Sequence, residues 1–415
     1  MKLQNLIYAT MVACAFSACS NDDDPNIPDP AQELDATLTV AFNAVGNNGS
    51  GLRSLTKADG DNQFNTIKKI GIAVFNAGAM NGAIAENGLI SYSVREKASA
   101  DIDTTACISA KSGSVKVLVV ANPTDDMFTN KTDYAGFLDA ISESAINKES
   151  LLMSSAVRTV TLEKGRNTIA ANASTVFKTG DADNSGHVAS TENIKVYRNV
   201  ARIEVPKITV DPREGFGKGK TAKFTLKAIY ASKVRKSVMV FGDASDWCRV
   251  VNTGAALIDG ETIYKDETSA YPNYIKTFTD NNEVNYGGDN SGVLELAPDK
   301  TMLFVYDNSS ETAIGKNDAT RLVIRGTYEY TTDGGATSKS ENAYWTTIIN
   351  NGTPQGGSGD FAVHCGVLRN VKYLVSVKIT GPGSTSEDPD GNAASLTANL
   401  EVVNWGVVNY DPDID

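Results

Sequence analysis

The chain has 415 residues, 41% of them hydrophobic, with 35 glycines and few aromatic residues. This length is enough for two ordinary domains, each with its own core. The formal net charge of -12 argues against a nucleic-acid-binding protein, because such proteins present a basic face. Beyond the N-terminal region, no apolar run approaches the length that crosses a bilayer. The composition favours an exported, β-rich protein.

The first residues have the pattern of a lipoprotein signal peptide. A mostly apolar run ends at Phe16, and small residues then lead to Cys19. We expect residues 1–18 to be removed and Cys19 to be lipidated, so that attachment to a membrane depends on this cysteine. Residues 19–35 form an acidic, proline-rich linker that is too polar to fold. Within it, Asp22–Asp24 are either a solvated spacer or an export signal.

A strand and a loop follow the linker. The stretch Ala36–Phe42 alternates with period two, which predicts a half-buried strand. The loop after it is rich in Gly, Asn and Ser and carries Arg53. A trypsin-like protease could cut at Arg53, although a plain exposed turn has the same composition.

Such a cut would separate the predicted strand from everything downstream. A sheet that loses a strand exposes a row of unpaired backbone groups beside an apolar groove. We therefore hypothesise that residues 36–53 are a propeptide strand, and that the tail of another copy replaces it.

The rest of the first half contains further strand patterns. Strands are expected at Asn65–Ala77 and Ser114–Pro123, and Arg158–Ser174 suggests a hairpin that turns at Lys164 and Gly165. Between Asp133 and Ser144 apolar residues recur at helical spacing, which predicts one short helix.

The second half repeats the theme of strands joined by polar loops. Its predicted strands are Ile194–Val205, Lys223–Val234, Thr301–Asn308, Thr320–Tyr330, Ala343–Asn350 and Val367–Gly381. Strands without intervening helices indicate antiparallel sandwiches. We predict an all-β fold with one short helix, in two tandem β-sandwich domains at residues 36–192 and 193–392.

The last segment, residues 393–415, has a strand pattern that changes phase. Leu396, Ala398, Leu400 and Val402 share one face, after which Val403, Trp405 and Val407 occupy the other. A strand that changes its buried face usually bulges or passes from one sheet to another. We expect this segment to act as the donor strand.

A calcium loop is the one candidate metal site. Asp181, Asp183 and Ser185 stand at ligand positions one, three and five, Glu192 stands at position twelve, and His187 lies in the same loop. A structural calcium is one interpretation. The other is a solvated loop, because the flanks are not helical and loops use the same residues.

The remaining reactive residues do not suggest catalysis. His364 and Cys365 are adjacent in a strand, so their side chains point to opposite faces. No Cys and His pair has zinc-ligand spacing, and the scattered Cys107, Cys248 and Cys365 define no disulfide framework. Trp247, Trp345 and Trp405 could stack on sugars, but core packing is the plainer interpretation. We expect no enzymatic activity.

Several stretches together resemble the fimbrilins of the Bacteroidales, the lipoprotein precursors of type V pili. They are the lipobox at Cys19, FNTIKKIGIAVFN, VLVVANP, the Met153–Ser154 element, VYRNVARIEV, FTLKAIYASKV, FVYDN, LRNVKYLVSVKITGPG and the terminal strand with Trp405. The resemblance covers nearly the whole chain and depends on their order and spacing.

The resemblance implies two transthyretin-like β-sandwich domains, exported as a palmitoylated outer-membrane lipoprotein. An arginine-specific, trypsin-like protease would cut between Arg53 and Ser54, or as second choice between Lys57 and Ala58, and so remove the N-terminal strand. A neighbouring copy would then donate its C-terminal strand. Arg53 and the long tail favour a stalk subunit of a surface fimbrium that supports adhesion and biofilm formation, with other copies and other fimbrial subunits as partners. An anchor or tip fimbrilin, or a monomeric surface lipoprotein that binds glycans or host protein, remains an alternative.

Overall fold

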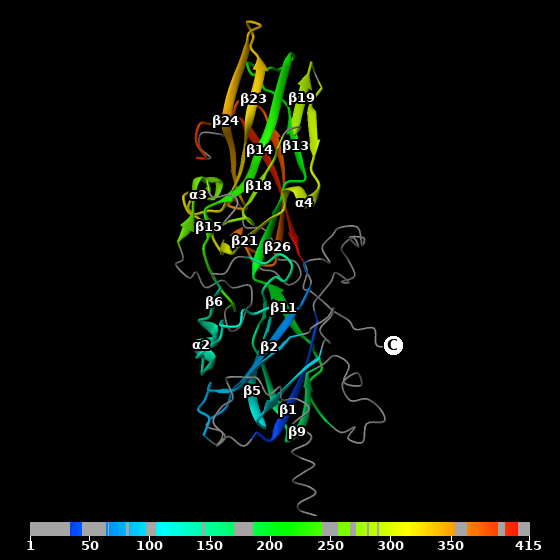
Figure 1. Cartoon of the computed structure of the whole chain (residues 1–415), viewed down its shortest axis with the longest axis vertical. Coiled ribbons are helices and arrows are strands. Elements are labelled where there is room, and N and C mark those ends of the chain that lie inside the picture. Colours follow the sequence, from blue (N-terminus) through cyan, green and yellow to red (C-terminus); the bar gives the residue numbers. More distant parts are fainter. Residues whose placement is uncertain are drawn as a thin grey trace, which may run out of the picture.

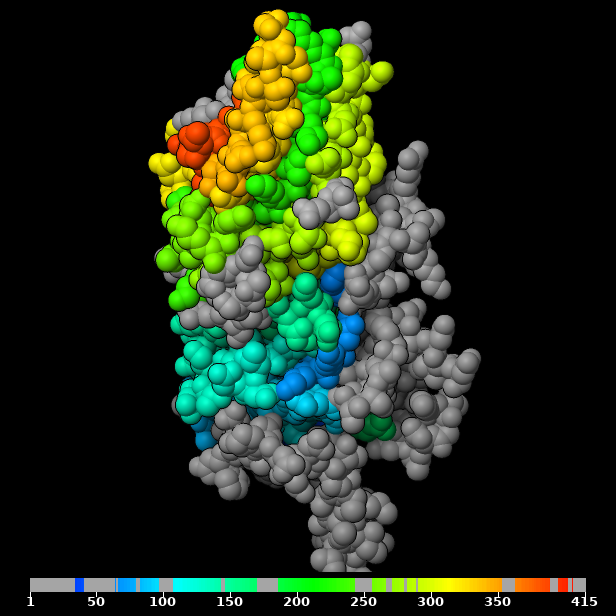
Figure 2. All heavy atoms as spheres, turned by 45° about the horizontal axis from the view of Figure 1, so that its top comes forward, coloured from blue at the N-terminus to red at the C-terminus, as the bar shows by residue number. Residues whose placement is uncertain are grey.

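The computed structural model describes residues 34–43, 64, 66–79, 83–96, 105–142, 146–169, 186–242, 256–265, 271–279, 282–288, 290–352, 363–388 and 395–405. Two β-rich halves are stacked along the long axis of the molecule, the first half blue to green and the second green to red (Figure 1). The space-filling view shows the two halves meeting along a broad boundary (Figure 2).

The first half is built on a ten-stranded sheet that folds over on itself. Its strands are β1 (Ala36–Asn43), β2 (Lys69–Asn76), β3 (Leu89–Glu96), β4 (Thr105–Ala110), β5 (Gly113–Ala121), β7 (Met153–Ser155), β8 (Arg158–Leu162), β9 (Gly165–Ile169), β10 (His187–Ser190) and β11 (Ile194–Arg198). The hydrogen-bonded order is β10-β9-β1-β11-β7-β5-β2-β3, with β4 beside β1 and β8 beside β5.

Two layers of this sheet enclose one core, which we call the first core. It includes Leu38, Ile108 and Ile169 from one layer and Ile72 and Val117 from the other. The strand β1 joins the layers, because it pairs with β4 and β9 in one and reaches β11 in the other. Its alternating apolar residues therefore fill the centre of the sandwich.

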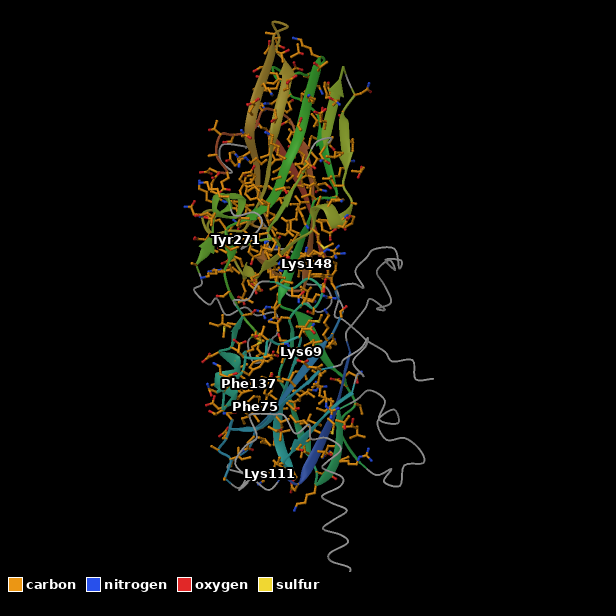
Figure 3. All side chains as sticks on the ribbon, in the orientation of Figure 1. Lys69, Phe75, Lys111, Phe137, Lys148 and Tyr271 are labelled. Carbon is orange, nitrogen blue, oxygen red and sulfur yellow. The ribbon has the colours of Figure 1, made fainter. Side chains whose placement is uncertain are left out.

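A smaller aromatic cluster covers the outer face of β2 and β5. The helix α2 (Tyr134–Leu138) begins at Asp133, whose carboxylate accepts a hydrogen bond from the Gly136 N–H at 2.7 Å and so caps the first turn. Phe137 of α2 packs on Phe75 of β2 with ring centroids 5.0 Å apart (Figure 3). This helix is the one that the sequence predicted.

The second half is a sandwich of two sheets. The six-stranded sheet contains β12 (Val200–Glu204), β13 (Lys207–Val210), β20 (Gly292–Glu295), β21 (Leu303–Tyr306), β26 (Val371–Ile379) and β27 (Leu396–Asn404). The five-stranded sheet contains β14 (Thr221–Ser232), β18 (Ile275–Thr277), β19 (Glu283–Gly287), β23 (Arg321–Thr331) and β24 (Thr337–Ile348). Their facing side chains form a second core, which includes Ile203 and Tyr373 from one sheet and Phe224, Ile324 and Trp345 from the other.

Short elements complete the described chain. Three two-stranded pairs are β15 (Val234–Arg235) with β17 (Leu257–Ile258), β16 (Val238–Met239) with β6 (Ile141–Ser142), and β22 (Asn308–Ser310) with β25 (Cys365–Val367). Two helices that the sequence did not predict are α3 (Gly260–Lys265) and α4 (Pro298–Thr301). Because β16 comes after β14 of the second sandwich along the chain and pairs with β6 of the first half, it ties the halves together.

The structure confirms the all-β sandwich fold and corrects three details. The predicted strand Ile194–Val205 is two strands, β11 in the first half and β12 in the second, separated at Asn199. The predicted hairpin turns at Gly165 (φ 91°), but β8 pairs with β5 whereas β9 pairs with β1. The sheets are mixed rather than purely antiparallel, because β1 runs parallel to β9 and β12 runs parallel to β26.

Candidate assembly site

The strand β1 has neighbours on both edges. It pairs with β4 in antiparallel register from Ala36 opposite Ala110, and with β9 in parallel register from Ala36 opposite Gly165. Ala36, Leu38 and Val40 are completely buried in the first core. Removing β1 would therefore open the sheet along two edges and uncover the centre of the core.

Asp35 fixes the start of β1. Its carboxylate accepts hydrogen bonds from the Ser112 N–H at 2.7 Å and the Ser112 hydroxyl at 2.9 Å, and Lys164 Nζ lies 3.6 Å away. Its carbonyl accepts from the Gly165 N–H at 2.9 Å. Burial raises the pKa of the Asp35 carboxyl, but the Ser112 hydrogen bonds and the Lys164 charge outweigh burial and leave the pKa below its ordinary value of 3.8.

Replacing Asp35 with Asn should lower the free energy of unfolding by about 1–2 kcal/mol at neutral pH, because two hydrogen bonds to a charged acceptor are weakened. Since the folded-state pKa is depressed, this stabilisation is present above 3.8 and is lost as the pH falls through the lower folded-state value. Urea denaturation should be measured at neutral pH and at about pH 3. The difference in the free energy of unfolding between wild type and Asp35→Asn should be smaller in acid. Ser112→Ala removes the hydroxyl donor but keeps the backbone N–H, so its loss should be smaller, and the double variant should lose little more than Asp35→Asn alone.

The C-terminal strand β27 lies on the second sandwich. It pairs with β26 in antiparallel register over its whole length, from Leu396 opposite Ile379 to Asn404 opposite Val371. Leu396, Ala398 and Leu400 are half-buried against the second core, as the alternating pattern predicted. Among the described residues β27 pairs only with β26, so it is an edge strand, unlike β1.

Trp405 comes directly after β27 and packs at the junction of the two halves. It is buried in the first core, although β27 itself lies on the second. This placement confirms that the tail changes its buried face between Leu400 and Trp405. The Trp405 backbone N–H donates a hydrogen bond to the Asn370 carbonyl at 3.2 Å, which continues the backbone pairing to the junction.

Several predicted site residues fall outside the described residues. They are Cys19, Arg53, Ser54, Lys57, Ala58, Asp181, Asp183, Ser185 and Val407. Val402 and Val403 lie in β27, where the structure describes their backbone only.

The two described members of the calcium loop have protein partners. His187 Nδ1 lies 3.4 Å from the Glu163 carboxylate, and Glu192 pairs with the Arg158 guanidinium. In the described part of the chain no three His, Cys, Asp or Glu side chains gather as metal ligands. Calcium binding there stays a prediction from the sequence.

The other described residues that the sequence analysis considered for catalysis or sugar binding are buried inside the fold. His364 is buried, with Nε2 2.6 Å from the Tyr373 hydroxyl, and Cys365 is a buried free thiol whose pKa is raised by burial. Trp345 is fully buried in the second core, and its Nε1 donates to the Gly381 carbonyl at 3.0 Å. No helix within the described ranges is both long and apolar enough to cross a membrane.

Sequence analysis missed the charged side chains buried at the junction. They are Arg198, Arg202, Glu204, Asp307 and Arg369. Arg202 pairs with Glu204, and Arg369 pairs with Asp307. A charge inside a strand pattern is normally assigned to the solvent face, but β12 is buried at all five positions. The signal was a short apolar run that contains Arg202 and ends with Glu204.

Comparison with known proteins agrees with this architecture. Residues 36–198 match the family described as major fimbrial subunit protein (FimA). That match spans the first half from the start of β1 to the end of β11. Over 434 residues the chain is 25% identical to the major fimbrium subunit FimA type-5 of Porphyromonas gingivalis, with 99% of this chain and 98% of that protein covered.

Solved structures share the fold. A fimbrilin from Porphyromonas gingivalis superposes with a TM-score of 0.53 at 18% identity, covering 91% of this chain and 99% of its own. A candidate cell adhesion protein from Parabacteroides distasonis gives a TM-score of 0.62 at 17% identity, with 91% and 99% covered. The family match over residues 36–198, the similarity along nearly the whole chain and the shared fold together make this chain similar to fimbrilins of the Bacteroidales.

Proposed function

We propose that this chain is the stalk subunit of a surface fimbrium and that it polymerises by exchanging strands. Proteolysis removes β1, and the C-terminal segment of a neighbouring copy takes its place. Similarity to fimbrial subunits supports a structural role at the cell surface in adhesion.

The position of β1 within the sheet is the main observation that supports the proposal. β1 has both edges hydrogen-bonded and an inner face that is completely buried, yet it is the first described strand and is followed by the loop that contains Arg53. One cut in that loop would disconnect β1 from the rest of the fold. A subunit without β1 has a long apolar groove with two unpaired edges, which favours capture of another strand.

The tail has the properties of a replacement strand. It presents Leu396, Ala398 and Leu400 at every second position, as β1 presents Ala36, Leu38 and Val40. Four to six apolar side chains, each contributing about 1.5–3 kcal/mol, would give a gross driving force of roughly 6–18 kcal/mol before the entropy of ordering the tail is subtracted. Because β27 is an edge strand of its own subunit, its departure leaves the other pairings of that sheet intact.

Exchange of this kind produces a filament. Each subunit gives a strand from one end of its chain and receives one in its first half, so the contact is heterologous and does not close. We propose that the precursor reaches the outer membrane through a lipid on Cys19, and that cleavage at Arg53 by a trypsin-like protease frees the subunit from that anchor.

Limited proteolysis of the purified full chain tests the proposal. Treatment with an arginine-specific protease should give a new N-terminus at Ser54, or at Ala58 if the lysine is cut, followed by SDS-resistant ladders. The variant Arg53→Ala with Lys57→Ala should remain uncut and monomeric. A chain that ends at Ala393 should be cut normally and form no ladder.

Two outcomes would contradict the stalk assignment. Cut chains that remain monomeric at high concentration, with the tail intact, would favour a monomeric adhesin. A fimbrium that carries a single copy of this chain would indicate an anchor or tip fimbrilin.

A further inference from the structure

We propose that Trp405 is a latch that holds the tail on its own subunit, and that Phe64 makes this latch sensitive to processing. The inference rests on the proposed strand exchange and concerns how the tail is released. It adds a regulatory contact at the junction of the two halves.

Aromatic rings from both halves form the pocket for Trp405. The Trp405 ring lies 6.1 Å from the Phe64 ring at an interplanar angle of 69° and 5.8 Å from the Phe304 ring at 37°. Phe64 and Phe304 also contact each other, with centroids 5.1 Å apart. Edge-to-face and tilted pairs at these distances attract each other beyond simple area burial.

Two buried arginines add to the pocket. Arg198 Cζ lies 4.6 Å from the Trp405 ring centroid, and Arg202 Cζ lies 5.6 Å from it. Arg202 also lies 5.1 Å from the Phe64 ring. A guanidinium over an aromatic face is attracted by the ring quadrupole, and the attraction is stronger where water is excluded. These contacts therefore anchor the end of the described tail at the junction of the two halves.

Phe64 connects this pocket to the processed segment. Its carbonyl accepts a hydrogen bond from Arg198 Nε at 3.4 Å, and its ring packs on Trp405. Phe64 follows the Arg53 loop along the chain, so in the uncut protein the segment before it continues to β1. Cleavage after Arg53 would leave Phe64 near a free chain end, with β1 no longer holding it from that side. We infer that Phe64 then leaves the pocket more readily and weakens the hold on Trp405.

The indole nitrogen favours release. Trp405 Nε1 is buried and has no hydrogen-bond acceptor within the described residues. A buried N–H without an acceptor is unfavourable, so Trp405 gains a hydrogen bond when it leaves for water. The aromatic and cation–π contacts hold the Trp405 side chain without a hydrogen bond from Nε1 to any described residue, so the loss of one neighbouring ring should loosen it.

Hydrogen exchange in the full, uncut chain tests the latch. The amides of residues 395–405 should exchange about tenfold faster in Trp405→Ala than in wild type, because the ring contacts are lost. Phe64→Ala should accelerate the same amides by a similar factor, and the double variant should exchange no faster than Trp405→Ala. Amides of β2 should keep wild-type protection, which shows that the first half remains folded.

Leu396→Ala provides the matched control. It weakens the packing of β27 far from Trp405, so its effect should multiply with that of Phe64→Ala instead of overlapping with it. Phe64→Leu, which keeps an apolar side chain but lacks an aromatic ring, should fall between wild type and Phe64→Ala. Cleavage of the wild-type chain at Arg53 should accelerate exchange of the tail as Phe64→Ala does.

The outcomes separate the latch from strand exchange. If Trp405→Ala leaves exchange of the tail within about twofold of wild type, Trp405 is not a latch. If Trp405→Ala accelerates exchange but Phe64→Ala and cleavage do not, the coupling to processing is wrong. A cut chain whose tail exchanges rapidly but which forms no ladder would overturn the proposed strand exchange and leave the latch supported.

Discussion

Replacing Leu38 with Ala should destabilise the uncut chain by about 2–5 kcal/mol, the range for a buried Leu that is truncated in a rigid core. Leu38 lies at the centre of β1, opposite Ile108 of β4 and Asn167 of β9, and it is completely buried. Strands on both sides hold the backbone in place, so the cavity has little room to collapse. Urea denaturation followed by circular dichroism should show the loss as a lower midpoint.

Thr39→Ala is the matched control for Leu38→Ala. Thr39 is the next residue of β1 and points to the opposite face, where it is half-buried. Its truncation should cost less than about 1 kcal/mol. Equal losses for the two variants would mean that β1 does not fill the first core as described. Such a result would also remove the physical basis for an apolar groove after cleavage.

Replacing Arg369 with Leu should cost about 3–5 kcal/mol at neutral pH, because it leaves a buried carboxylate without its charge partner. The Arg369 and Asp307 side chains are 1% and 0% exposed, with Nε 3.5 Å from Oδ2. The guanidinium also donates to the carbonyl of Met239 in β16 at 2.9 Å and to the carbonyl of Val240, just after β16, at 3.3 Å. The loss should therefore weaken the junction as well as the second sandwich.

The pH dependence of this variant follows from Asp307. Burial raises the pKa of the Asp307 carboxyl above its ordinary value of 3.8, and Arg369 opposes that rise. Without Arg369 the folded-state pKa should rise further. A raised folded-state pKa gives stability that is present below 3.8 and is lost as the pH rises through the folded-state value. The deficit of Arg369→Leu should thus shrink as the pH is lowered from neutral, when measured by urea denaturation.

A double variant provides the control. Arg369→Leu combined with Asp307→Asn removes the unpaired charge and should recover part of the stability that Arg369→Leu alone loses. Full recovery is not expected, because the Met239 carbonyl still loses the hydrogen bond that Arg369 donates. A single-variant loss below about 1 kcal/mol would contradict the role assigned to this buried pair.

Strand patterns were readable in the sequence because their causes are local. The alternation in Ala36–Phe42 reports which side of the backbone meets a core, and this alone predicted β1. The capped helix at Tyr134 and the phase change before Trp405 were found in the same way. The helices α3 and α4 were missed, because four to six residues give too few turns for a period to be recognised.

The sequence did not reveal which strands pair with each other, because strand pairing depends on residues far apart in the chain. The parallel pairing of β1 with β9 joins Leu38 to Asn167 and leaves no local mark. For the same reason Arg158–Ser174 suggested a hairpin, although its two strands belong to different layers of the first half. The change of sheet at Asn199 divided a stretch that has one continuous strand pattern.

The sequence by itself determined that this protein is a β-sandwich chain with a first strand and a tail of matching alternation. Side-chain period and loop composition are local properties, and they persist whatever the strands pair with. Only the tertiary structure decided that β1 is central, that β27 lies at an edge, and that Trp405 shares a pocket with Phe64. These features arise where strands distant in sequence bury their faces together, so no stretch of the chain contains them alone.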